Sequence, residues 1–400
     1  MPIHAAIESF MRESYGQALA WLAPRAGGDI AAAEDALSEG LLAALRQWPE
    51  EGVPKEPAAW LITAAKRRLI DAQRRDATRE KHADELRAAL ESPAMPAAQD
   101  ERLPLLFVCT HPAIDEAVRA PLMLQVVLGL DAERIASAYL ISPATMSQRL
   151  VRAKARIKEL GIRFAVPSVE HWPERVESVL AAIYAAYTLG RGDPADDSRD
   201  LTTEAISLAR LLVTLLPEEP EAHGLLALCL HCEARHAAQW ADGRYIPLPE
   251  QDVQRWQAVL QQEAEQHLHL ASQHQRLGRY QLEAAIQSVH ASRQFSGHTN
   301  WPAIACLYQG LLTHTSALGA QVGHAIAQSH AHGASIGLEL LEAVPKERAQ
   351  SHQPWWAARA DFLARLHRTD EARAAYQMAI GLSESPAVRE FLRQRCATLG

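Results

Sequence analysis

The sequence has no long hydrophobic run. Its most apolar stretches, residues 179–186 and 225–230, are far shorter than the roughly 20 residues that a membrane-spanning helix requires. The N-terminus also lacks a basic segment followed by an apolar one, which is the pattern of a secretory signal. We therefore expect a cytoplasmic protein with no membrane partner.

Cysteines are few and scattered. The chain has five, at Cys109, Cys229, Cys232, Cys306 and Cys396. An odd and widely spaced set excludes the disulfide framework of a small secreted domain and predicts reduced thiols. Cys229 and Cys232 lie close together in an apolar stretch, but no second closely spaced pair completes a zinc site. We predict that they are packing residues, and we assign no metal and no cofactor.

Catalytic signatures and strand signals are missing as well. The sequence contains no phosphate-binding G-x-x-x-x-G-K-[ST], no G-x-G-x-x-G after a strand, no H-E-x-x-H and no G-x-S-x-G. We therefore predict that the protein is not an enzyme. Alternating apolar and polar residues are scarce, whereas apolar residues recur at helical spacing throughout. The predicted fold class is all-α.

The formal net charge of -8 at first argues against a nucleic-acid partner, but the positive charges are clustered. Residues 66–79 carry six basic and two acidic side chains, and residues 149–163 carry six basic and one acidic side chain. Two such stripes can neutralise backbone phosphates even when another domain is acidic. The alternative for each stripe is a solvated helix face.

Composition divides the chain into four parts. Residues 1–80 and 101–166 are predicted to form two small helical domains, joined by a linker, residues 81–100, that is rich in proline and small residues. From Pro167 the composition changes, and residues 167–400 hold 15 of the 18 histidines. We predict that these residues form a larger helical domain.

The larger domain shows traces of a tetratricopeptide-like (TPR-like) repeat. The residues at the spacing of such a repeat are Trp356, Leu363, Ala372, Tyr376 and Ala379. The second half of the pattern recurs at Ala205, Ala209, Leu212 and Pro217. Irregular segments such as residues 242–249 interrupt the period, so a generic alanine-rich helical domain is the alternative.

Residues 130–158 predict a helix-turn-helix, the motif that places a helix in the major groove of DNA. Asp131 is a suitable cap for the first helix, and Ser142 followed by Pro143 is a typical start for the second. The apolar residues of the second helix recur at helical spacing and should be buried; they are Met146, Leu150, Ala153 and Ile157.

The opposite face of the second helix is polar and basic. The residues that we expect to contact DNA are Thr145, Gln148, Arg149, Arg152 and Lys154. Their spacing would bring polar side chains to base edges and the basic end of the helix to phosphates. The alternative is an amphipathic helix of an ordinary bundle, but the joint occurrence of the short turn, the Ser-Pro start and the arginine run favours DNA binding.

The chain resembles extracytoplasmic-function sigma factors, a sigma-70 type of RNA polymerase subunit. Residues 101–166 resemble the region that contacts the promoter -35 element, and residues 1–80 resemble the region that holds core RNA polymerase and opens the -10 element. Residues 33–45 resemble the acidic helix of that family, which implies that Glu34, Asp35 and Glu39 bind core polymerase. A solvated acidic face is the alternative for these three residues.

Residues 57–75 resemble the helix that the family lays against the melted -10 strand. The resemblance implies -10 contacts by Lys66, Arg67, Arg68, Arg74 and Arg75. Family members commonly have Asn where this chain has Arg67, which puts the -10 sequence itself in doubt. The preceding residues 48–57 correspond to the loop that captures a flipped base in the family, although we expect Trp48 to be a core residue.

The resemblance extends into the C-terminal part. Residues 107–112, 278–286 and 370–376 are similar to those of sigma factors with a long helical extension, whose own C-terminal domain takes part in control. The resemblance implies a sigma factor whose partners are core RNA polymerase and promoter DNA, and whose extension binds either the sigma regions or another protein. The alternative is a helix-turn-helix regulator on a helical scaffold that does not replace a sigma subunit.

Overall fold

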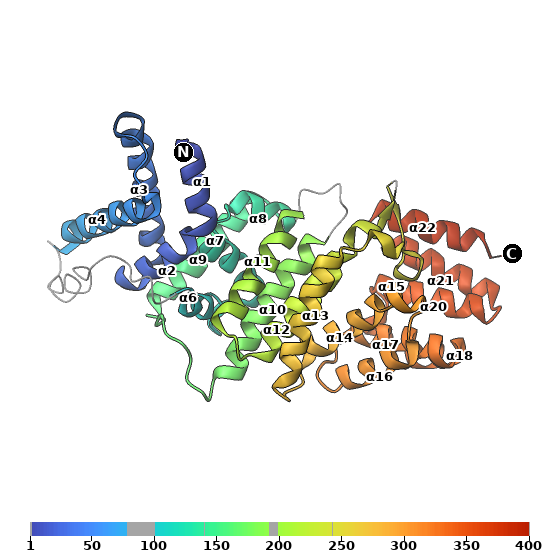
Figure 1. Cartoon of the computed structure of the whole chain (residues 1–400). Helices are drawn as coiled ribbons and strands as arrows, with labels where there is room; N and C mark the ends of the chain where they lie inside the picture. The colour runs from blue at the N-terminus through green and yellow to red at the C-terminus, as the bar shows by residue number, and fades with distance from the viewer. Residues whose placement is uncertain (1, 78–100, 140, 192–198, 242, 400) are drawn as a thin grey trace. The chain divides into compact units, whose positions relative to one another are not determined.

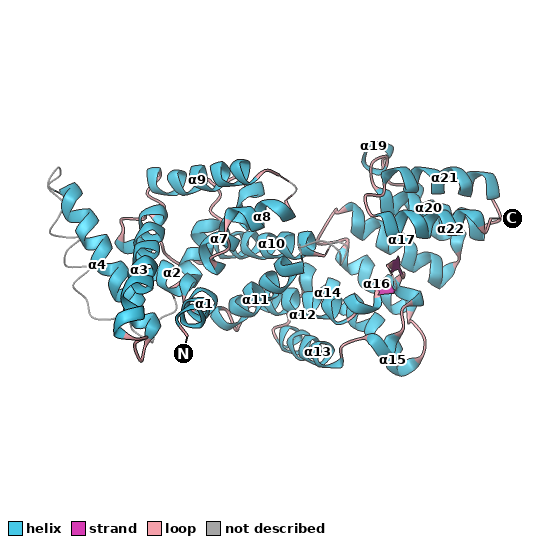
Figure 2. Ribbon diagram, turned by 90° about the horizontal axis from the view of Figure 1, so that it is seen from above, coloured by secondary structure: helices cyan, strands magenta, loops and turns pink. Residues whose placement is uncertain are grey.

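The computed structural model describes residues 2–77, 101–139, 141–191, 199–241 and 243–399. Their regular secondary structure is almost entirely helical, which confirms the all-α class (Figures 1 and 2). The described strands are the two-residue β1 (Trp240–Ala241) and β2 (Arg244–Tyr245), which pair antiparallel with Trp240 opposite Tyr245. Contacts group the chain into two compact units, an N-terminal unit, Met1–Leu215, and a C-terminal unit, Leu216–Gly400.

The N-terminal unit contains ten described helices. They are α1 (Ile3–Glu13), α2 (Tyr15–Arg25), α3 (Ile30–Glu51), α4 (Pro57–Ala77), α6 (Arg102–Cys109), α7 (Glu116–Leu128), α8 (Ala132–Ala138), α9 (Pro143–Glu159), α10 (Trp172–Gly190) and α11 (Arg199–Leu215). The predicted linker, residues 81–100, lies outside the described residues.

Several of these helices begin at residues whose side chains cap them. The Asp29 carboxylate accepts a hydrogen bond from the Ala32 amide at the start of α3, and Asp115 does the same for Ala117 at the start of α7. Such caps satisfy amide groups that have no partner inside the helix. Helix α7 ends at Gly129, whose φ of 72° lies in the left-handed region that glycine adopts readily.

The stretch before α4 was predicted to be a loop from residue 48 to residue 57. Instead α3 continues through Trp48 to Glu51, and the chain leaves the helix at Gly52, where φ is 83°. Trp48 is 2% exposed and its ring meets Trp60 edge-on, with 5.5 Å between centroids. Burial of this indole extends the helix and shortens the connection, and it confirms that Trp48 is a core residue.

The N-terminal unit continues beyond residue 166, where composition suggested a boundary. Helix α10 packs on α6 and α7, and the Arg175 guanidinium donates a hydrogen bond to the Phe107 carbonyl oxygen. The Phe107 and Trp172 rings lie 5.7 Å apart. Burial of these apolar surfaces keeps α10 and α11 with the preceding helices, so the contacts divide the chain after Leu215.

The C-terminal unit contains eleven described α-helices. They are α12 (Pro220–Ala234), α13 (Ala258–Gln273), α14 (Arg279–Ala291), α15 (Arg293–Ser296), α16 (Trp301–Leu311), α17 (Leu318–His332), α18 (Ala334–Glu342), α19 (Lys346–Ala349), α20 (Gln353–Arg365), α21 (Thr369–Leu382) and α22 (Pro386–Ala397). Short 3-10 turns lie between α12 and α13 at η1 (His236–Ala238), η2 (Leu248–Glu250) and η3 (Val253–Arg255).

Helix α12 is buried on nearly all sides. Its Cys229 and Cys232 lie inside the unit, as the packing hypothesis predicted. The Glu221 carboxylate accepts hydrogen bonds from the Tyr280 and Gln281 amides at 2.8 Å and 3.1 Å, and so fixes the start of α14 against α12. Gly224 lets the two helices approach, because a Cβ at this position would lie 2.6 Å from the Gln281 nitrogen.

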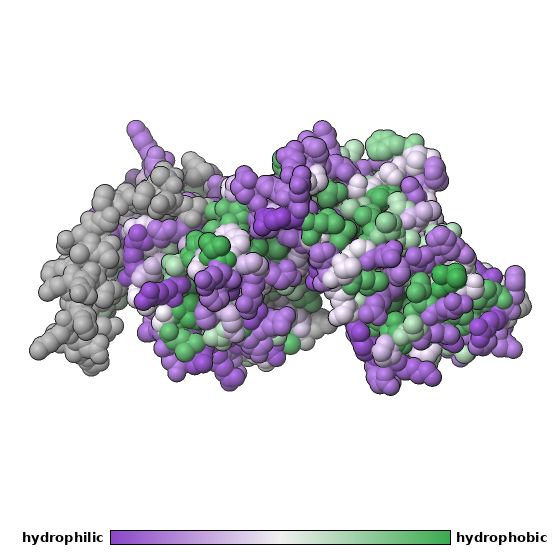
Figure 3. Space-filling view, turned by 90° about the horizontal axis from the view of Figure 1, so that it is seen from below, coloured by the Kyte–Doolittle hydropathy of each residue, from purple (hydrophilic) through white to green (hydrophobic). Residues whose placement is uncertain are grey.

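Helices α20 and α21 pair at the C-terminal end, where the repeat spacing was clearest. Leu363, Ala372, Tyr376 and Ala379 are all buried in one apolar cluster, and Trp356 packs on it partly buried. The TPR-like classification stays a prediction. On the face shown in Figure 3, hydrophobic side chains form separate patches among hydrophilic ones, a common pattern on globular surfaces. No helix in the described part of the chain has the length and apolar character to cross a membrane.

The C-terminal unit also buries a histidine between aromatic and cationic groups. His290 meets the Trp301 ring edge-on, and Trp301 in turn stacks on His330 at 4.0 Å between centroids. Burial, with the positive charges of Arg235 and Arg293 and with His330 nearby, lowers the pKa of His290 from 6.5 to about 3. His290 is therefore neutral in the folded protein at neutral pH.

This lowered pKa predicts acid sensitivity of the C-terminal unit. The unfolded chain binds a proton at His290 below pH 6.5, whereas the folded unit binds it only near pH 3, so stability present above pH 6.5 is lost as the pH falls. The free energy of unfolding should drop by about 2 kcal/mol more between pH 7 and pH 5 than it does in the His290→Gln variant. Urea titrations monitored by hydrogen exchange in α14 measure this difference, and equal drops would contradict it.

Candidate nucleic-acid interface

Helices α8 and α9 form the predicted helix-turn-helix. The Asp131 carboxylate accepts a hydrogen bond from the Arg134 amide at 2.7 Å, and the Ser142 hydroxyl accepts one from the Thr145 amide at 3.2 Å. Pro143 occupies the first turn of α9, where a missing amide hydrogen costs no helical bond. The stripe predicted to be buried, Met146, Leu150, Ala153 and Ile157, is buried.

Four of the five residues predicted for the -35 contact share the exposed side of α9. These four, Thr145, Gln148, Arg149 and Arg152, are called the DNA face of α9 below. Among the described residues, neither Arg149 nor Arg152 forms a salt bridge, whereas Arg156 on the same helix pairs with Glu159 at 3.1 Å. The DNA face therefore presents two unneutralised guanidinium groups, the groups that bind guanine edges and phosphates well.

The fifth residue, Lys154, points the other way. It is 8% exposed, and its ammonium group lies 2.5 Å from a Glu34 carboxylate oxygen and 3.1 Å from the Gln125 side-chain oxygen. The structure therefore separates Lys154 from the other four residues, because its charge is already neutralised inside the N-terminal unit. In this conformation Lys154 has no path to a DNA surface.

The three acidic residues predicted on α3 are divided in the same way. Asp35 and Glu39 lie on the exposed side of α3, beside the exposed Leu42 and Leu45. Glu34 faces inward to Lys154. Burial raises the pKa of the Glu34 carboxyl above its usual value, although Lys154 acts in the opposite direction.

The predicted -10 residues lie on α4. Arg67 and Arg68 are exposed, and Lys66 is half-buried, with its ammonium group 5.9 Å from the centre of the Trp21 ring. Arg74 and Arg75 lie on the last turns of α4, where the side chains are outside the described part of the structure. Leu61, Ala65 and Leu69 hold α4 in the core, which leaves Arg67 and Arg68 toward solvent.

Comparison with known proteins identifies the N-terminal segment. Residues 11–79 match the family described as Sigma-70 region 2. An uncharacterized protein of Rhizobium meliloti (strain 1021) is 35% identical over 377 residues, which span 91% of this chain and 89% of the relative. The match over residues 11–79 supports a sigma-70 family factor. Residues 175–272 match a second description, Family of unknown function (DUF6596), and no solved structure matches the chain.

The groups that join α3 to α9 were not predicted from the sequence. Lys158 near the end of α9 pairs with Asp29 at the start of α3, with 2.6 Å between the charged atoms. Burial and the Lys158 hydrogen bond act on Asp29 in opposite directions, and its pKa is lowered overall. Gln125 on α7 adds the bond to Lys154. No sequence signal marks these partners, because they lie far apart in the chain.

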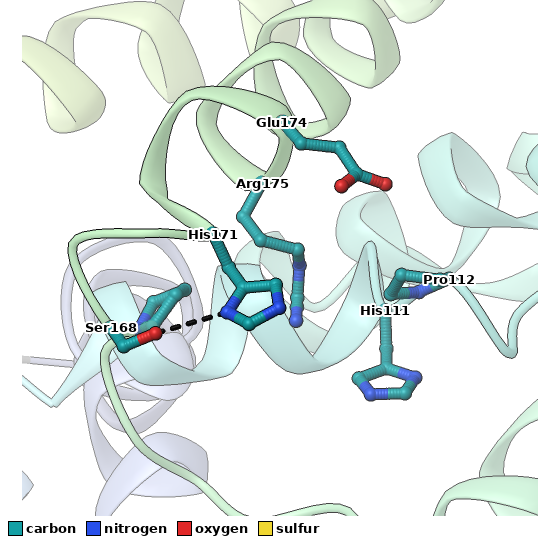
Figure 4. A pocket seen from close by; sticks show the side chains of 7 residues that line it. His111, Pro112, Ser168, His171, Glu174 and Arg175 are labelled. Carbon is teal, nitrogen blue, oxygen red and sulfur yellow. Dashed lines mark hydrogen bonds between the residues drawn. The ribbon is translucent and has the colours of Figure 1, made fainter.

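A pocket of about 390 Å³ lies between the α6–α7 loop and the start of α10 (Figure 4). Its lining includes His111, His171 and Arg175, and the Ser168 hydroxyl is 3.0 Å from Nδ1 of His171. Burial and the neighbouring Arg175 and Arg119 lower the pKa of His111. Of the lining residues, Arg175 is the first residue of the segment that matches the second family description.

Proposed function

We propose that this sigma-70 family chain is an alternative sigma factor of the extracytoplasmic-function type. It binds core RNA polymerase, recognises the -35 and -10 elements of a promoter and promotes transcription initiation. The observation that carries the proposal is the region 2 match over residues 11–79 in a chain that also has a capped helix-turn-helix with an exposed basic face. The proposal requires no covalent chemistry of the protein.

Helix α3 supplies the polymerase contact in this proposal. Its outer side combines two acidic groups, Asp35 and Glu39, with two exposed apolar side chains, Leu42 and Leu45. In the described part of the chain neither acidic group forms a salt bridge. A surface with apolar residues beside unpaired charges suits a protein partner that carries basic groups.

Helices α4 and α9 supply the promoter contacts. The exposed Arg67 and Arg68 on α4 can follow the backbone of a melted -10 strand. The DNA face of α9 can enter the major groove at the -35 element, where Gln and Arg side chains bind adenine and guanine edges. The two helices thereby serve different elements of one promoter.

Substitution of the DNA face tests the -35 contact. Arg149→Ala and Arg152→Ala should each weaken binding to promoter DNA by about 1 to 3 kcal/mol if the residue contacts a base. The matched control is Arg156→Ala on the same helix, whose side chain is paired with Glu159. Binding is measured with the complex of this chain and core polymerase. If promoter occupancy in both variants equals that of the control, Arg149 and Arg152 do not contact the -35 element.

Charge reversal on α3 tests the polymerase contact. Asp35→Lys together with Glu39→Lys should lower affinity for core RNA polymerase roughly tenfold or more, because the attraction to basic groups becomes repulsion. Glu50→Lys, at the exposed end of the same helix, is the control. If the wild-type chain binds DNA but gives no promoter-specific transcript with core polymerase, the protein is a helix-turn-helix regulator instead.

We further propose that the C-terminal unit modulates this activity. A test chain should end at Leu215, because termination at residue 167 would remove α10 and expose the apolar surface of α6 and α7. The truncated chain should differ from the full chain by roughly fivefold or more in transcription with core polymerase. Equal polymerase binding and equal transcription would count against modulation.

A further inference from the structure

The pocket of Figure 4 is built from three separate segments of the N-terminal unit. The α6–α7 loop supplies His111 and Pro112, the connection between α9 and α10 supplies Pro167 and Ser168, and the first turn of α10 supplies Arg175. The volume of about 390 Å³ lies in the range of cavities that hold small organic molecules. No lining residue takes part in the proposed promoter or polymerase contacts, so those contacts do not account for the pocket.

The Arg175 guanidinium has donors that the described residues do not use. Its Nη2 atom donates a hydrogen bond to the Phe107 carbonyl oxygen, whereas Nη1 donates to no described group. The Nε atom is buried and has no partner within the described ranges either. Arg175 also forms no salt bridge with a described carboxylate. A guanidinium with unused donors and no counter-ion is a binding group for an oxyanion.

The electrostatic field in the pocket is positive. Burial, and then the charges of Arg175 and Arg119, lower the pKa of His111. Burial and Arg119 also lower the pKa of Arg175, while Glu174 acts in the opposite direction. The two arginines and the one glutamate leave an excess of one positive charge. An anion beside Arg175 would balance this charge.

Two imidazole rings lie close to the guanidinium. Nδ1 of His111 accepts a hydrogen bond from the Ala113 amide at 3.1 Å, which places the hydrogen of the neutral ring on Nε2. The Ser168 hydroxyl lies 3.0 Å from Nδ1 of His171 and orients that ring. In the view of Figure 4 the Arg175 side chain extends between the two rings. An oxygen bound to the guanidinium therefore has further hydrogen-bonding groups nearby.

The rest of the lining is suited to an apolar group. Pro112 and Pro167 carry no polar side-chain atom, and the faces of imidazole rings can pack against another flat ring. The connection that supplies Pro167 also exposes Val166 and Val169, by 48% and 90%. An inorganic ion would leave these surfaces in water, whereas a ligand with an apolar body would cover part of them.

We propose that this pocket binds a small organic monocarboxylate, a molecule with one carboxylate and a compact apolar body about the size of benzoate. Arg175 binds the carboxylate through its unused donors, and the prolines contact the apolar body. The single excess positive charge suits a monoanion, and Glu174 repels a dianion such as phosphate. This inference goes beyond the proposed function and does not rest on it.

Three probes separate the contributions of charge and of the apolar body. The full chain is titrated with benzoate, with benzamide and with inorganic phosphate by isothermal titration calorimetry. Benzamide has nearly the same shape as benzoate but no charge, so it should bind roughly tenfold or more weakly. Phosphate should also bind more weakly than benzoate. The proposal is overturned if benzoate does not bind at millimolar concentration, or if either other probe binds as tightly.

Two variants locate the binding in the pocket. Arg175→Gln should weaken benzoate binding roughly tenfold or more, because a charge-assisted hydrogen bond is lost. Its control is Arg163→Gln, an exposed arginine of the α9–α10 connection outside the lining. Ser168→Phe fills the pocket and should weaken binding to a similar extent, and its control is Val169→Phe at the next residue.

Ser168 is exposed, so Ser168→Phe keeps the test decisive if Arg175→Gln loses its bond to Phe107 and fails to fold. Benzoate affinities of the two pocket variants equal to those of their controls would overturn the site.

The titration of His111 provides a readout that is independent of affinity. A carboxylate bound beside the ring favours the protonated imidazole, so saturating benzoate should raise the pKa of His111. The pKa is measured in the full chain by nuclear magnetic resonance of the imidazole C–H signals, and His111→Gln identifies the signal by its loss. An unchanged pKa of His111 would show that benzoate binds elsewhere and would overturn the proposal.

Discussion

The N-terminal unit depends on two opposite charges, 120 residues apart in sequence, that are buried together. Lys154 and Glu34 would each carry a large desolvation cost alone, so each requires the other in place. This mutual requirement orients α9 on α3 and allows α7 to contribute Gln125. It also determines which faces of the two helices remain free: the DNA face of α9 and the acidic outer side of α3 both point away from the pair.

The same pair explains why basic residues of similar appearance take different roles. Within α9, Lys154 and Lys158 form salt bridges with Glu34 on α3 and with Asp29 at its start. Arg156 pairs with Glu159 on its own helix, and Arg149 and Arg152 form no salt bridge among the described residues. The sequence presents these five as one basic stripe. The helical spacing of the sequence correctly predicts that Arg149 and Arg152 are exposed. It does not predict that Lys154 is buried, because the long Lys154 side chain runs inward along the edge of the apolar stripe.

Local features of the fold were predictable because their causes are local. The Ser142 cap, Pro143 in the first turn and the buried stripe of α9 follow from spacing within one helix. Predictions became wrong where packing overrode composition. The proline and glycine after Trp48 suggested a loop, but burial of that indole against Trp60 carries α3 on to Glu51.

The sequence by itself determined the helical class, the two helices of the helix-turn-helix and the exposed DNA face of α9, and its resemblance to sigma factors agrees with the region 2 match over residues 11–79. Each of these depends on residues within a few helical turns of one another. The tertiary structure alone decided that Glu34 and Lys154 form a pair, that Gly16 admits the α7 backbone, and that α10 and α11 remain with the N-terminal unit. These contacts join segments that are distant in the sequence. They stabilise the protein only when folding brings the segments together, so no local sequence pattern predicts them.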